Sequence, residues 1–374
     1  MVAINNISEA SRIVIKVGSS LVTSKDGNIN EGFLDIIASD LLELRNKNKE
    51  IIIVSSGAVS LGNIINKNKN SLSLSESQAA SSIGQIKLIN GWKNSLEKRD
   101  LKIAQILITA DDTENRRRYL NARSTFEELL KNNYIPIINE NDTVATAEIR
   151  YGDNDRLAAR VAGMLSADCL ILLSNVNGLY SKDPKDEKSE LIKEVSEISE
   201  EIMSMAGDAS QLGSGGMITK LEAAKICMSA GSSMVIASGN NIEPLLSIKK
   251  GVNCTWFNPE IASKNSLKIW LSGQLKPSGT IFSDPGASKA LLSGNSLLAA
   301  GVTSIEGDFD KGDTLLIFNN KNIEIARGLS NYSSKDLKKI IGKKSEEIKS
   351  ILGYMDKPEI IHKDNLVFTV EQEK

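Results

Sequence analysis

Two lysine-bearing glycine turns stand out as segments able to bind an anion. The first, Lys16-Val-Gly-Ser-Ser20, combines a glycine amide, serine hydroxyls and a lysine charge, which together suit a phosphate group. The second, Gly213-Ser-Gly-Gly-Met-Ile-Thr-Lys220, opens a helical pattern and presents amides and a further lysine. Neither is a P-loop or a GxGxxG motif, and each alone also fits an ordinary turn beside a solvated lysine.

Acidic and amide side chains gather in two further segments. Asn139-Glu-Asn-Asp142 follows a buried apolar run, where four polar side chains are costly unless they line a cleft. An aspartate there can receive an ammonium group, and an asparagine can bind a carboxylate. Gly152-Asp-Asn-Asp155 precedes a helical pattern, whose N-terminus favours a carboxylate. An Asx-rich surface turn and a helix cap are the alternatives for these two segments.

Two more small, polar segments follow apolar runs. Val54-Ser-Ser-Gly-Ala58 would free backbone N–H groups for a carboxylate or a phosphoryl group. Ser174-Asn-Val-Asn-Gly-Leu-Tyr180 would form a wall for a nucleotide. Serine-glycine and asparagine-glycine pairs are also common turn signals, so neither segment is specific alone.

The elements that must position these segments alternate between short apolar runs and helical patterns. The runs are rich in Ile and Val on both faces, which is typical of buried parallel strands; they cover residues 12–17, 51–54, 103–108, 134–138, 169–173 and 234–237. Helices are expected at residues 31–45, 77–96, 122–131, 156–165 and 218–230. This alternation predicts a three-layer α/β/α sandwich with a mainly parallel sheet. Ligands bind such sheets at the carboxyl ends of the strands, where the polar segments lie.

A change of pattern marks a second domain. Proline, glycine and asparagine punctuate residues 257–278, and beyond them short β segments alternate with turns. A charged helical stretch at 334–351 precedes a last strand at 366–370. We therefore expect an α/β domain at 1–258, a linker at 259–277, a small β-barrel domain at 278–360 and a C-terminal tail at 361–374.

Composition narrows the function classes. The chain has 374 residues, is 41% hydrophobic, and carries a net charge of −2, which argues against a dedicated nucleic-acid binder. Its single histidine, His362, excludes most histidine-based catalysis and zinc binding. The three cysteines lie far apart and indicate a reducing compartment. Without a signal peptide or a membrane-length apolar run, the sequence predicts a soluble cytoplasmic protein.

The segments taken together resemble the glutamate 5-kinase branch of the amino acid kinase family. The resemblance rests on IKVGSS, SSGAVSLG, IINENDTVATAEI, GDND, LLSNVNGLYSKDP, AGD, GSGGMITK and IASG, in this order. It continues beyond the linker, where GTIFSDPGASKALLSGNSLLAAGVTSIEGDFDKGD is similar to a PUA domain. Nearly the whole chain is covered, and the acidic segments combined with the PUA-like part are the most specific features.

The resemblance implies ATP-dependent phosphorylation of the side-chain carboxylate of L-glutamate to L-glutamyl 5-phosphate, the first step of proline biosynthesis. Mg²⁺ would come with the nucleotide, and no metal-ligating residue is expected. The implied catalytic residues are Lys16, Gly57, Asp155 and Lys220. The implied glutamate-binding residues are Ser56, Asp142 and Asn154. The implied ATP-binding residues are Lys16, Gly18, Ser174, Asn175, Ser214, Gly215, Gly216, Met217, Ile218, Thr219 and Lys220.

Three segments depart from the commoner family pattern. Ser55 and Ser214 stand where threonine is usual and keep a hydroxyl. Ser174-Asn175 stands where threonine-aspartate is usual, which removes a charge near the nucleotide and implies a modest effect on its affinity. The family also implies a homodimer or homotetramer, feedback inhibition by proline, and hand-over of the product to glutamyl phosphate reductase.

Two other functions fit some of the same residues. Another amino acid kinase could act on aspartate, N-acetylglutamate or a nucleoside monophosphate, although an ammonium partner such as Asp142 suits free glutamate and has no purpose for an N-acetylated substrate. PUA domains also occur in RNA-modifying enzymes. Residues 278–374 carry 13 Lys+Arg against 14 Asp+Glu, a balance that does not favour binding to RNA phosphates.

Overall fold

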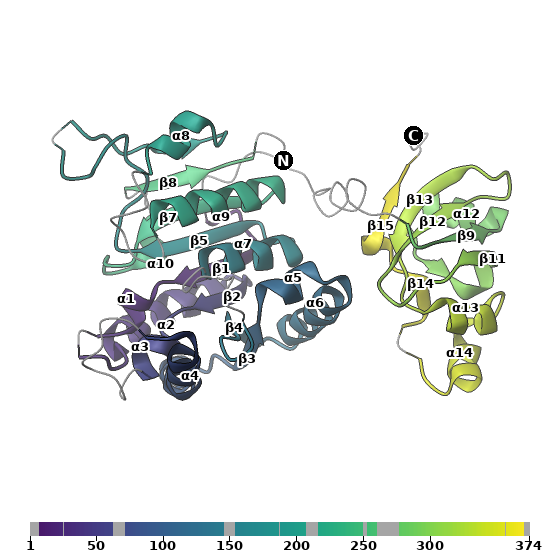
Figure 1. Ribbon diagram of the computed structural model, residues 1–374, viewed down its shortest axis with the longest axis horizontal. Coiled ribbons are helices and arrows are strands. Elements are labelled where there is room, and N and C mark those ends of the chain that lie inside the picture. The colour runs from purple at the N-terminus through teal and green to yellow at the C-terminus, as the bar shows by residue number, and fades with distance from the viewer. Residues whose placement is uncertain are drawn as a thin grey trace. The chain divides into compact units, whose positions relative to one another are not determined.

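The computed structural model describes residues 7–24, 26–62, 72–145, 154–186, 188–206, 216–249, 253–259, 277–355 and 357–369. The chain forms two compact units, the first made largely of residues before 260 and the second largely of residues after 276 (Figure 1). Each unit has its own hydrophobic core.

The first unit is built on an eight-stranded sheet with the order β3-β4-β2-β1-β5-β7-β8-β6. Its strands are β1 (Arg12–Val17), β2 (Glu50–Ser55), β3 (Ile103–Ile108), β4 (Ile135–Glu140), β5 (Cys169–Ser174), β6 (Glu194–Val195), β7 (Ser233–Ser238) and β8 (Cys254–Phe257). All neighbouring strands are parallel except β7 and β8. The predicted mainly parallel sheet is confirmed, with all six expected strands in it.

Helices connect the strands and bury both faces of the sheet. They are α1 (Ser19–Val22), α2 (Glu31–Asn46), α3 (Ala58–Gly62), α4 (Leu74–Glu97), α5 (Ala110–Glu114), α6 (Arg116–Lys131), α7 (Asn154–Met164), α8 (Glu200–Ser204), α9 (Met217–Ser229) and α10 (Pro244–Lys249). Ile13 and Ile15 of β1 share one core with α2 and α4. Val14, on the opposite face of β1, is equally buried, and α7 packs on this strand. Because helices cover both faces of this strand, successive side chains are all buried, and the apolar run in the sequence is unbroken.

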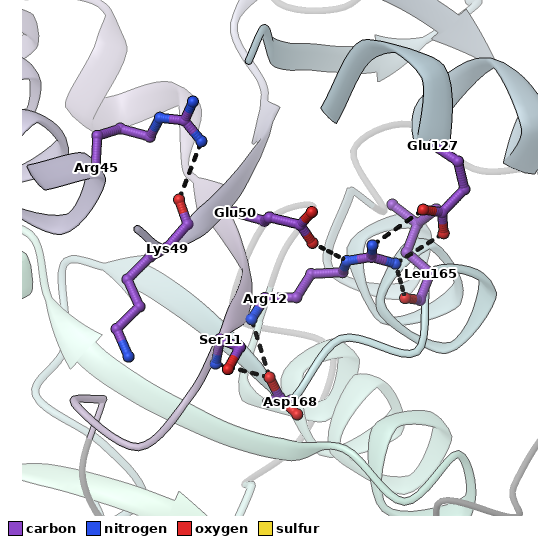
Figure 2. A network of polar contacts seen from close by, with 8 residues as sticks. All are labelled: Ser11, Arg12, Arg45, Lys49, Glu50, Glu127, Leu165 and Asp168. Atoms are coloured by element: carbon purple, nitrogen blue, oxygen red, sulfur yellow. Dashed lines mark hydrogen bonds and ion pairs between the residues drawn. The ribbon is translucent and has the colours of Figure 1, made fainter. Parts of the chain in front are cut away.

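The amino end of β1 is held by a polar network, shown in Figure 2. The Arg12 guanidinium donates to Glu50 at 2.7 Å and to Glu127 at 2.8 Å. The Asp168 carboxylate accepts the backbone N–H groups of Ser11 and Arg12 at 2.7 and 2.9 Å. The network therefore ties β1 to β2, to α6 and to the start of β5, at the end of the sheet opposite the polar segments.

Close backbone packing fixes α4 against α3. A Cβ on Gly84 of α4 would lie 1.8 Å from the carbonyl oxygen of Ala58, and one on Gly62 would lie 1.7 Å from that of Ala80. Neither position therefore accepts a side chain, and the two helices pack backbone to backbone. Packed in this way, α4 lies beside the carboxyl ends of β2 and β4, and it bonds to Ser55 and Asn139 there.

Three helix starts differ from the sequence expectation by two residues or more. Helix α4 begins at Leu74, three residues earlier than expected. Helix α7 begins at Asn154, so Asn154 and Asp155 lie inside its first turn instead of preceding it. Helix α6 begins at Arg116, six residues earlier than expected, because its arginine-rich first turn has no apolar periodicity. The short strand β6 and its neighbour β8 were not expected from the sequence.

The second unit contains a five-stranded sheet and a separate two-stranded ladder. The sheet has the order β11-β9-β12-β13-β15, in which only β9 and β12 are parallel. Its strands are β9 (Gly279–Ser283), β11 (Val302–Gly307), β12 (Thr314–Phe318), β13 (Glu324–Leu329) and β15 (Leu366–Phe368). The ladder pairs β10 (Leu297–Leu298) with β14 (Glu359–Ile361). The sequence predicted that the domain ends at 360 and that a tail follows at 361–374. The start of this tail is wrong, because β15 pairs with β13 and extends the sheet to Phe368.

Helices of the second unit add two corrections. Helix α12 (Pro285–Leu292) was missed, although Asp284 caps it by accepting from the Ala287 N–H and proline occupies its first turn. The single helical stretch expected at 334–351 is two helices, α13 (Ser334–Ile340) and α14 (Ser345–Leu352). Gly342, between them, has a φ of +72°, which interrupts the helix. Two short 3-10 helices, Ala299–Gly301 and Lys363–Asn365, complete the unit.

Candidate active site

The carboxyl edge of the sheet brings together both lysines of the glycine turns. Lys16 lies near the end of β1, and Lys220 lies in the first turn of α9. Their Nζ atoms approach the two oxygens of one carboxylate, at 2.6 Å from Lys16 to Asp155 Oδ1 and at 3.0 Å from Lys220 to Asp155 Oδ2. Asp155 thus holds two ammonium groups at one place. We call these three residues the lysine–aspartate cluster.

The lysine–aspartate cluster is almost sealed from solvent. Only 1% of the surface of Asp155 is exposed, and both lysines are buried. Burial alone would raise the pKa of Asp155, but the charges of Lys16 and Lys220 and their hydrogen bonds outweigh it, so the pKa lies below its ordinary value. The cluster carries one negative and two positive charges, and this excess of positive charge in a water-poor site favours a phosphoryl group in transfer.

The start of α9 adds polar groups next to the cluster. Thr219 donates its hydroxyl to the Gly216 carbonyl at 2.8 Å and lies 3.3 Å from Asp155 Oδ2. Gly216 stands at the N-cap without a side chain, and Met217 and Ile218 are half-buried in the first turn. Ser214 and Gly215, predicted to bind ATP, lie outside the described residues. Unpaired N–H groups at the start of α9 suit a phosphate.

Glycines shape the two loops that follow β1 and β2. Gly57 has a φ of +117°, a conformation that residues with a side chain avoid. Gly18 caps α1, and its carbonyl accepts the N–H groups of Leu21 and Val22. The two loops are joined because the Ser56 N–H donates to the Val17 carbonyl at 3.1 Å. Gly18 and Gly57 therefore follow the ends of the paired strands β1 and β2, and Lys16 lies near the end of β1.

The exit of β5 lies beside the first loop. Ser174 pairs with Ser238 at the end of β7, and its carbonyl accepts the Gly239 N–H at 2.8 Å. Asn175 is exposed, and its side-chain N–H donates to the Ser20 hydroxyl at 2.9 Å. Both residues therefore line the edge on the β5–β7 side, where the sequence predicts a nucleotide.

A chain of amides occupies the other side of the cluster. Asn154 Nδ2 donates to the Ser56 hydroxyl at 2.8 Å and to Asn139 Oδ1 at 2.9 Å. Asn139 Nδ2 in turn donates to Gln85 Oε1 at 2.8 Å. Two of the predicted glutamate-binding residues, Ser56 and Asn154, are thus in direct contact, and Asn154 directly precedes Asp155. We call Gln85, Asn139 and Asn154 the amide chain.

Asp142, the third predicted glutamate-binding residue, is tied to α4. The Ser81 hydroxyl donates to Asp142 Oδ2 at 2.5 Å. Burial raises the pKa of Asp142, and the hydrogen bond from Ser81 offsets only part of this rise. Asp142 lines a pocket of about 290 Å³ with Ser81, Ser82 and Gln85, together with residues of β3 and β4. Asp142 is connected to Ser56 and Asn154 only indirectly among the described contacts: it bonds to Ser81, while Gln85, one turn further along α4, bonds to the amide chain.

Sequence reasoning missed three residues of this arrangement. Asn139 belongs to the acidic and amide segment but received no role, although a buried asparagine at a strand end is itself a signal. Ser81 and Gln85 carry no local motif, because α4 is long and its polar positions resemble a solvent-facing surface. Only their contacts with β4 and the following loop mark them as part of the site.

Metal-binding groups are sparse in the part of the chain that the structure describes, where no group of three His, Cys, Asp or Glu side chains could hold an ion. The buried lysines and the helix start of α9 instead provide contacts of the kind that phosphates use. A nucleotide that brings its own Mg²⁺ needs few protein ligands for the ion, since Mg²⁺ retains several waters.

The amino acid kinase family matches residues 11–238, and the PUA domain matches residues 279–352. The chain therefore belongs to the amino acid kinase family and carries a PUA domain after its kinase part. Its curated relatives include "Glutamate 5-kinase" of Paramagnetospirillum magneticum, 49% identical over 96% of this chain and 98% of the relative. The protein of the same name from Agrobacterium fabrum is 48% identical over 96% of this chain and 93% of the relative.

Solved structures also resemble the chain. UMP kinase from Ureaplasma parvum matches 66% of this chain and 98% of its own, with 16% identity and a TM-score of 0.47. Carbamate kinase from Giardia lamblia bound to AMP-PNP matches 68% of this chain and 100% of its own, with 14% identity and a TM-score of 0.49. Among the described residues, no helix is long and apolar enough to cross a membrane.

Proposed function

We propose that this kinase transfers the γ-phosphoryl group of ATP to the side-chain carboxylate of L-glutamate and forms L-glutamyl 5-phosphate. The observation that carries the proposal is the contact of Lys16 and Lys220 with the buried Asp155. The choice of glutamate as acceptor is supported by the relatives named "Glutamate 5-kinase", which match almost the whole chain.

The chemistry fits the residues. A glutamate side chain has an ordinary pKa of about 4.3, so the attacking carboxylate is ionised at neutral pH and needs no general base. The obstacle is repulsion between an anionic nucleophile and an anionic phosphate. Lys16 and Lys220 would flank the phosphoryl group and neutralise its charge, while Asp155 holds both ammonium groups in place.

Backbone groups would complete the phosphate site. The loops at Gly18 and Gly57, and the first turn of α9 from Gly216 to Lys220, would direct N–H groups at the phosphates. Ser174 and Asn175 would contact the nucleotide from the β5 side. Mg²⁺ carried by the nucleotide would supply further positive charge to the phosphates.

The acceptor would lie on the side of the amide chain. Ser56 and Asn154 would bind glutamate next to the cluster, since Asn154 adjoins Asp155 in the first turn of α7. Asp142 would balance the glutamate ammonium. This pairing favours free glutamate over N-acetylglutamate, whose nitrogen carries no charge.

An ADP-release assay with purified protein tests the proposal. We expect turnover with L-glutamate, and far less with L-aspartate, N-acetylglutamate or UMP. Turnover with N-acetylglutamate and none with glutamate would overturn the assignment of the acceptor. No ATP-dependent turnover with any of these acceptors would overturn the roles given to the cluster.

Pathway and domain roles extend the proposal. An acyl phosphate is labile in water, so a reductase that converts glutamyl phosphate would consume the product, and proline would be the end product and feedback inhibitor.

The kinase activity would reside in residues 1–258, and the part at 278–360 would serve regulation or assembly of a homodimer or homotetramer in the cytoplasm. Glutamate-dependent turnover measured with and without proline, in the full chain and after truncation at residue 258, tests both roles.

A further inference from the structure

Helix α4 presents one polar row to the acceptor side of the site. Its members are spaced three, four and seven residues apart, which places them on one face of the helix. Each bonds to a segment at the carboxyl edge: Gln78 to the Ala145 carbonyl, Ser81 to Asp142, Gln85 to Asn139 and Trp92 to the Ser55 hydroxyl. The row runs from the half-buried Gln78 and Gln85 to the fully buried Trp92.

Hydrogen bonding fixes the direction of the amide chain. Asn154 Nδ2 lies 3.4 Å from the Ser55 carbonyl, and a backbone carbonyl can only accept. The same NH₂ group donates to Asn139 Oδ1, so the Asn139 NH₂ group must point away, toward Gln85. Gln85 accepts from it through Oε1. In this arrangement the amides of the chain donate in one direction, from Asn154 through Asn139 to Gln85.

This orientation leaves one polar atom without a partner. Asn154 Oδ1 is buried, and among the described residues nothing donates a hydrogen bond to it. Asn154 is 5% exposed and lies between Ser56 and Asp155. A buried amide oxygen without a donor costs stability, so this atom favours a donor from a bound ligand or a water.

We infer that Gln85 is a positioning residue for the acceptor, which holds Asn139 and thereby keeps the Asn154 carboxamide oxygen turned toward an N–H group of the amino-acid substrate. The inference rests on the proposed function, and it adds a determinant of substrate choice on α4. The ammonium of an amino acid has three N–H donors, so Asn154 and Asp142 can each take one. An acceptor without the ammonium would gain nothing from the amide chain.

The seat of α4 supports this role. Gly84, next to Gln85, packs so closely on α3 that no side chain fits there. Trp92 anchors the same helix to Ser55 through a 2.9 Å hydrogen bond. Because α4 is fixed at both points, Gln85 has little freedom to follow Asn139 if the amides reorient, and it can act as a fixed acceptor.

The test uses the full chain and three variants. Gln85→Met removes the hydrogen-bond acceptor at similar volume, and Gln85→Glu keeps an acceptor oxygen. Asn90→Leu is the matched control, since Asn90 is an exposed amide on the same helix, outside both the pocket and the amide chain. The measurements are the KM for L-glutamate, the KM for ATP and the inhibition constant of glutarate, which is glutamate without its ammonium.

We expect Gln85→Met to raise the KM for glutamate about tenfold and to leave the glutarate inhibition constant and the KM for ATP unchanged. Gln85→Glu and Asn90→Leu should retain a KM for glutamate near that of the wild type. A merely structural role would weaken glutarate and glutamate binding together, and that result would overturn the inference.

Two further outcomes separate the inference from the proposed function. If the wild type shows no glutamate-dependent turnover, both fail together. If the wild type is active and Gln85→Met has an unchanged KM for glutamate, only the role of Gln85 fails. Should Gln85→Met melt well below Asn90→Leu, then Asn139→Ser, which interrupts the amide chain at its middle, must raise the KM for glutamate without changing the glutarate inhibition constant. Otherwise the inference is overturned.

Discussion

The two sides of the candidate site are built from different interactions. On one side, the lysine–aspartate cluster concentrates three full charges in a buried space. On the other side, the amide chain uses neutral hydrogen bonds with fixed directions. Charge acts strongly but with little angular preference, whereas an amide distinguishes a donor from an acceptor.

This contrast suggests a division of labour. In phosphoryl transfer the charge on the phosphate oxygens must be neutralised, and for this two ammonium groups held by one carboxylate are suited. The choice among acceptors depends on whether each buried polar atom finds its partner, and for this oriented amides are suited. We therefore expect changes in the cluster to act mainly on kcat and changes on the amide side to act mainly on the KM for the acceptor.

The largest effect should come from removing a lysine of the cluster. Lys220→Ala deletes a positive charge placed to contact the phosphoryl group, and kcat should fall by about a thousandfold, within the range for loss of one transition-state contact. Lys225→Ala, at an exposed position of the same helix, is the matched control and should keep the wild-type kcat. Turnover assays and thermal melts of both variants provide the measurement.

A wild-type kcat in Lys220→Ala would show that the charge of Lys220 does not act in phosphoryl transfer. A variant that loses turnover only in proportion to its loss of folded protein would contradict a catalytic role as well. The expected result is a large loss of kcat in a protein that still melts close to the wild-type temperature.

The second effect concerns the carboxylate between the lysines. Asp155→Asn keeps the shape but leaves two buried ammonium groups without a counter-charge. We expect kcat to fall about a hundredfold. The free energy of unfolding should fall by about 3 kcal/mol at pH 7, as expected for a broken buried ion pair. Chemical unfolding of wild type and variant measures this difference.

The pH dependence gives the control for Asp155→Asn. The folded-state pKa of Asp155 is lowered, so its stabilising contribution is complete above the unfolded pKa and is lost as the pH falls through the folded pKa. The stability difference between wild type and variant should therefore stay constant from pH 7 to about pH 4 and shrink only below it. A difference that already shrinks near pH 6 would contradict the lowered pKa.

The lysine–aspartate cluster could be predicted from the sequence, whereas the residues of α4 on the amide side could not. Lys16, Asp155 and Lys220 each stand in a short segment at the end of an element, and a parallel sheet brings such ends to one edge. Their convergence was therefore predictable from local patterns. Gln85 and Ser81 lie within a 24-residue helix, where a polar residue at any one position looks like a surface residue. Only tertiary packing against β4 reveals them.

The fold shows the same limit. The six predicted strands all lie in the sheet of the first unit, and five of them are buried, whereas β3 at the sheet edge is partly exposed. The buried strand β8 was not predicted. The two-residue strand β6 exists only through its pairing with β8, so no local pattern can announce it. Helix α12 differs from both, because Asp284 and Pro285 are a start signal that the sequence does contain.

A smaller effect is expected at Asp142, the one charged residue predicted to bind the acceptor. Asp142→Asn should raise the KM for glutamate about thirtyfold and leave the KM for ATP unchanged, since a neutral amide cannot balance an ammonium. Asp111→Asn, on the exposed surface of α5, serves as the control. An equal rise in the KM for ATP would show that Asp142 does not act on acceptor binding alone.

The pKa of Asp142 sharpens this prediction. Burial raises the pKa, so the carboxyl gains its proton at a higher pH than an ordinary aspartate and then no longer attracts the ammonium. In the wild type the KM for glutamate should therefore rise on acidification while ordinary aspartates are still ionised. The glutamate side chain itself titrates equally in wild type and Asp142→Asn, so the difference between their pH profiles reports Asp142 alone. Identical profiles would contradict the raised pKa.

The smallest effect is expected at the rim of the nucleotide side, where Asn175 stands in place of a charged residue. Asn175→Asp should change the KM for ATP by at most about threefold, because the side chain is exposed and salt screens its charge. The contact with Ser20 survives the substitution, since a serine hydroxyl can donate to a carboxylate as well as accept from an amide. The KM for glutamate should not change. A tenfold change in the KM for ATP would show that a charge controls binding at this rim, as Asp142 is expected to do on the acceptor side, and substrate binding could then not be attributed mainly to neutral hydrogen bonds.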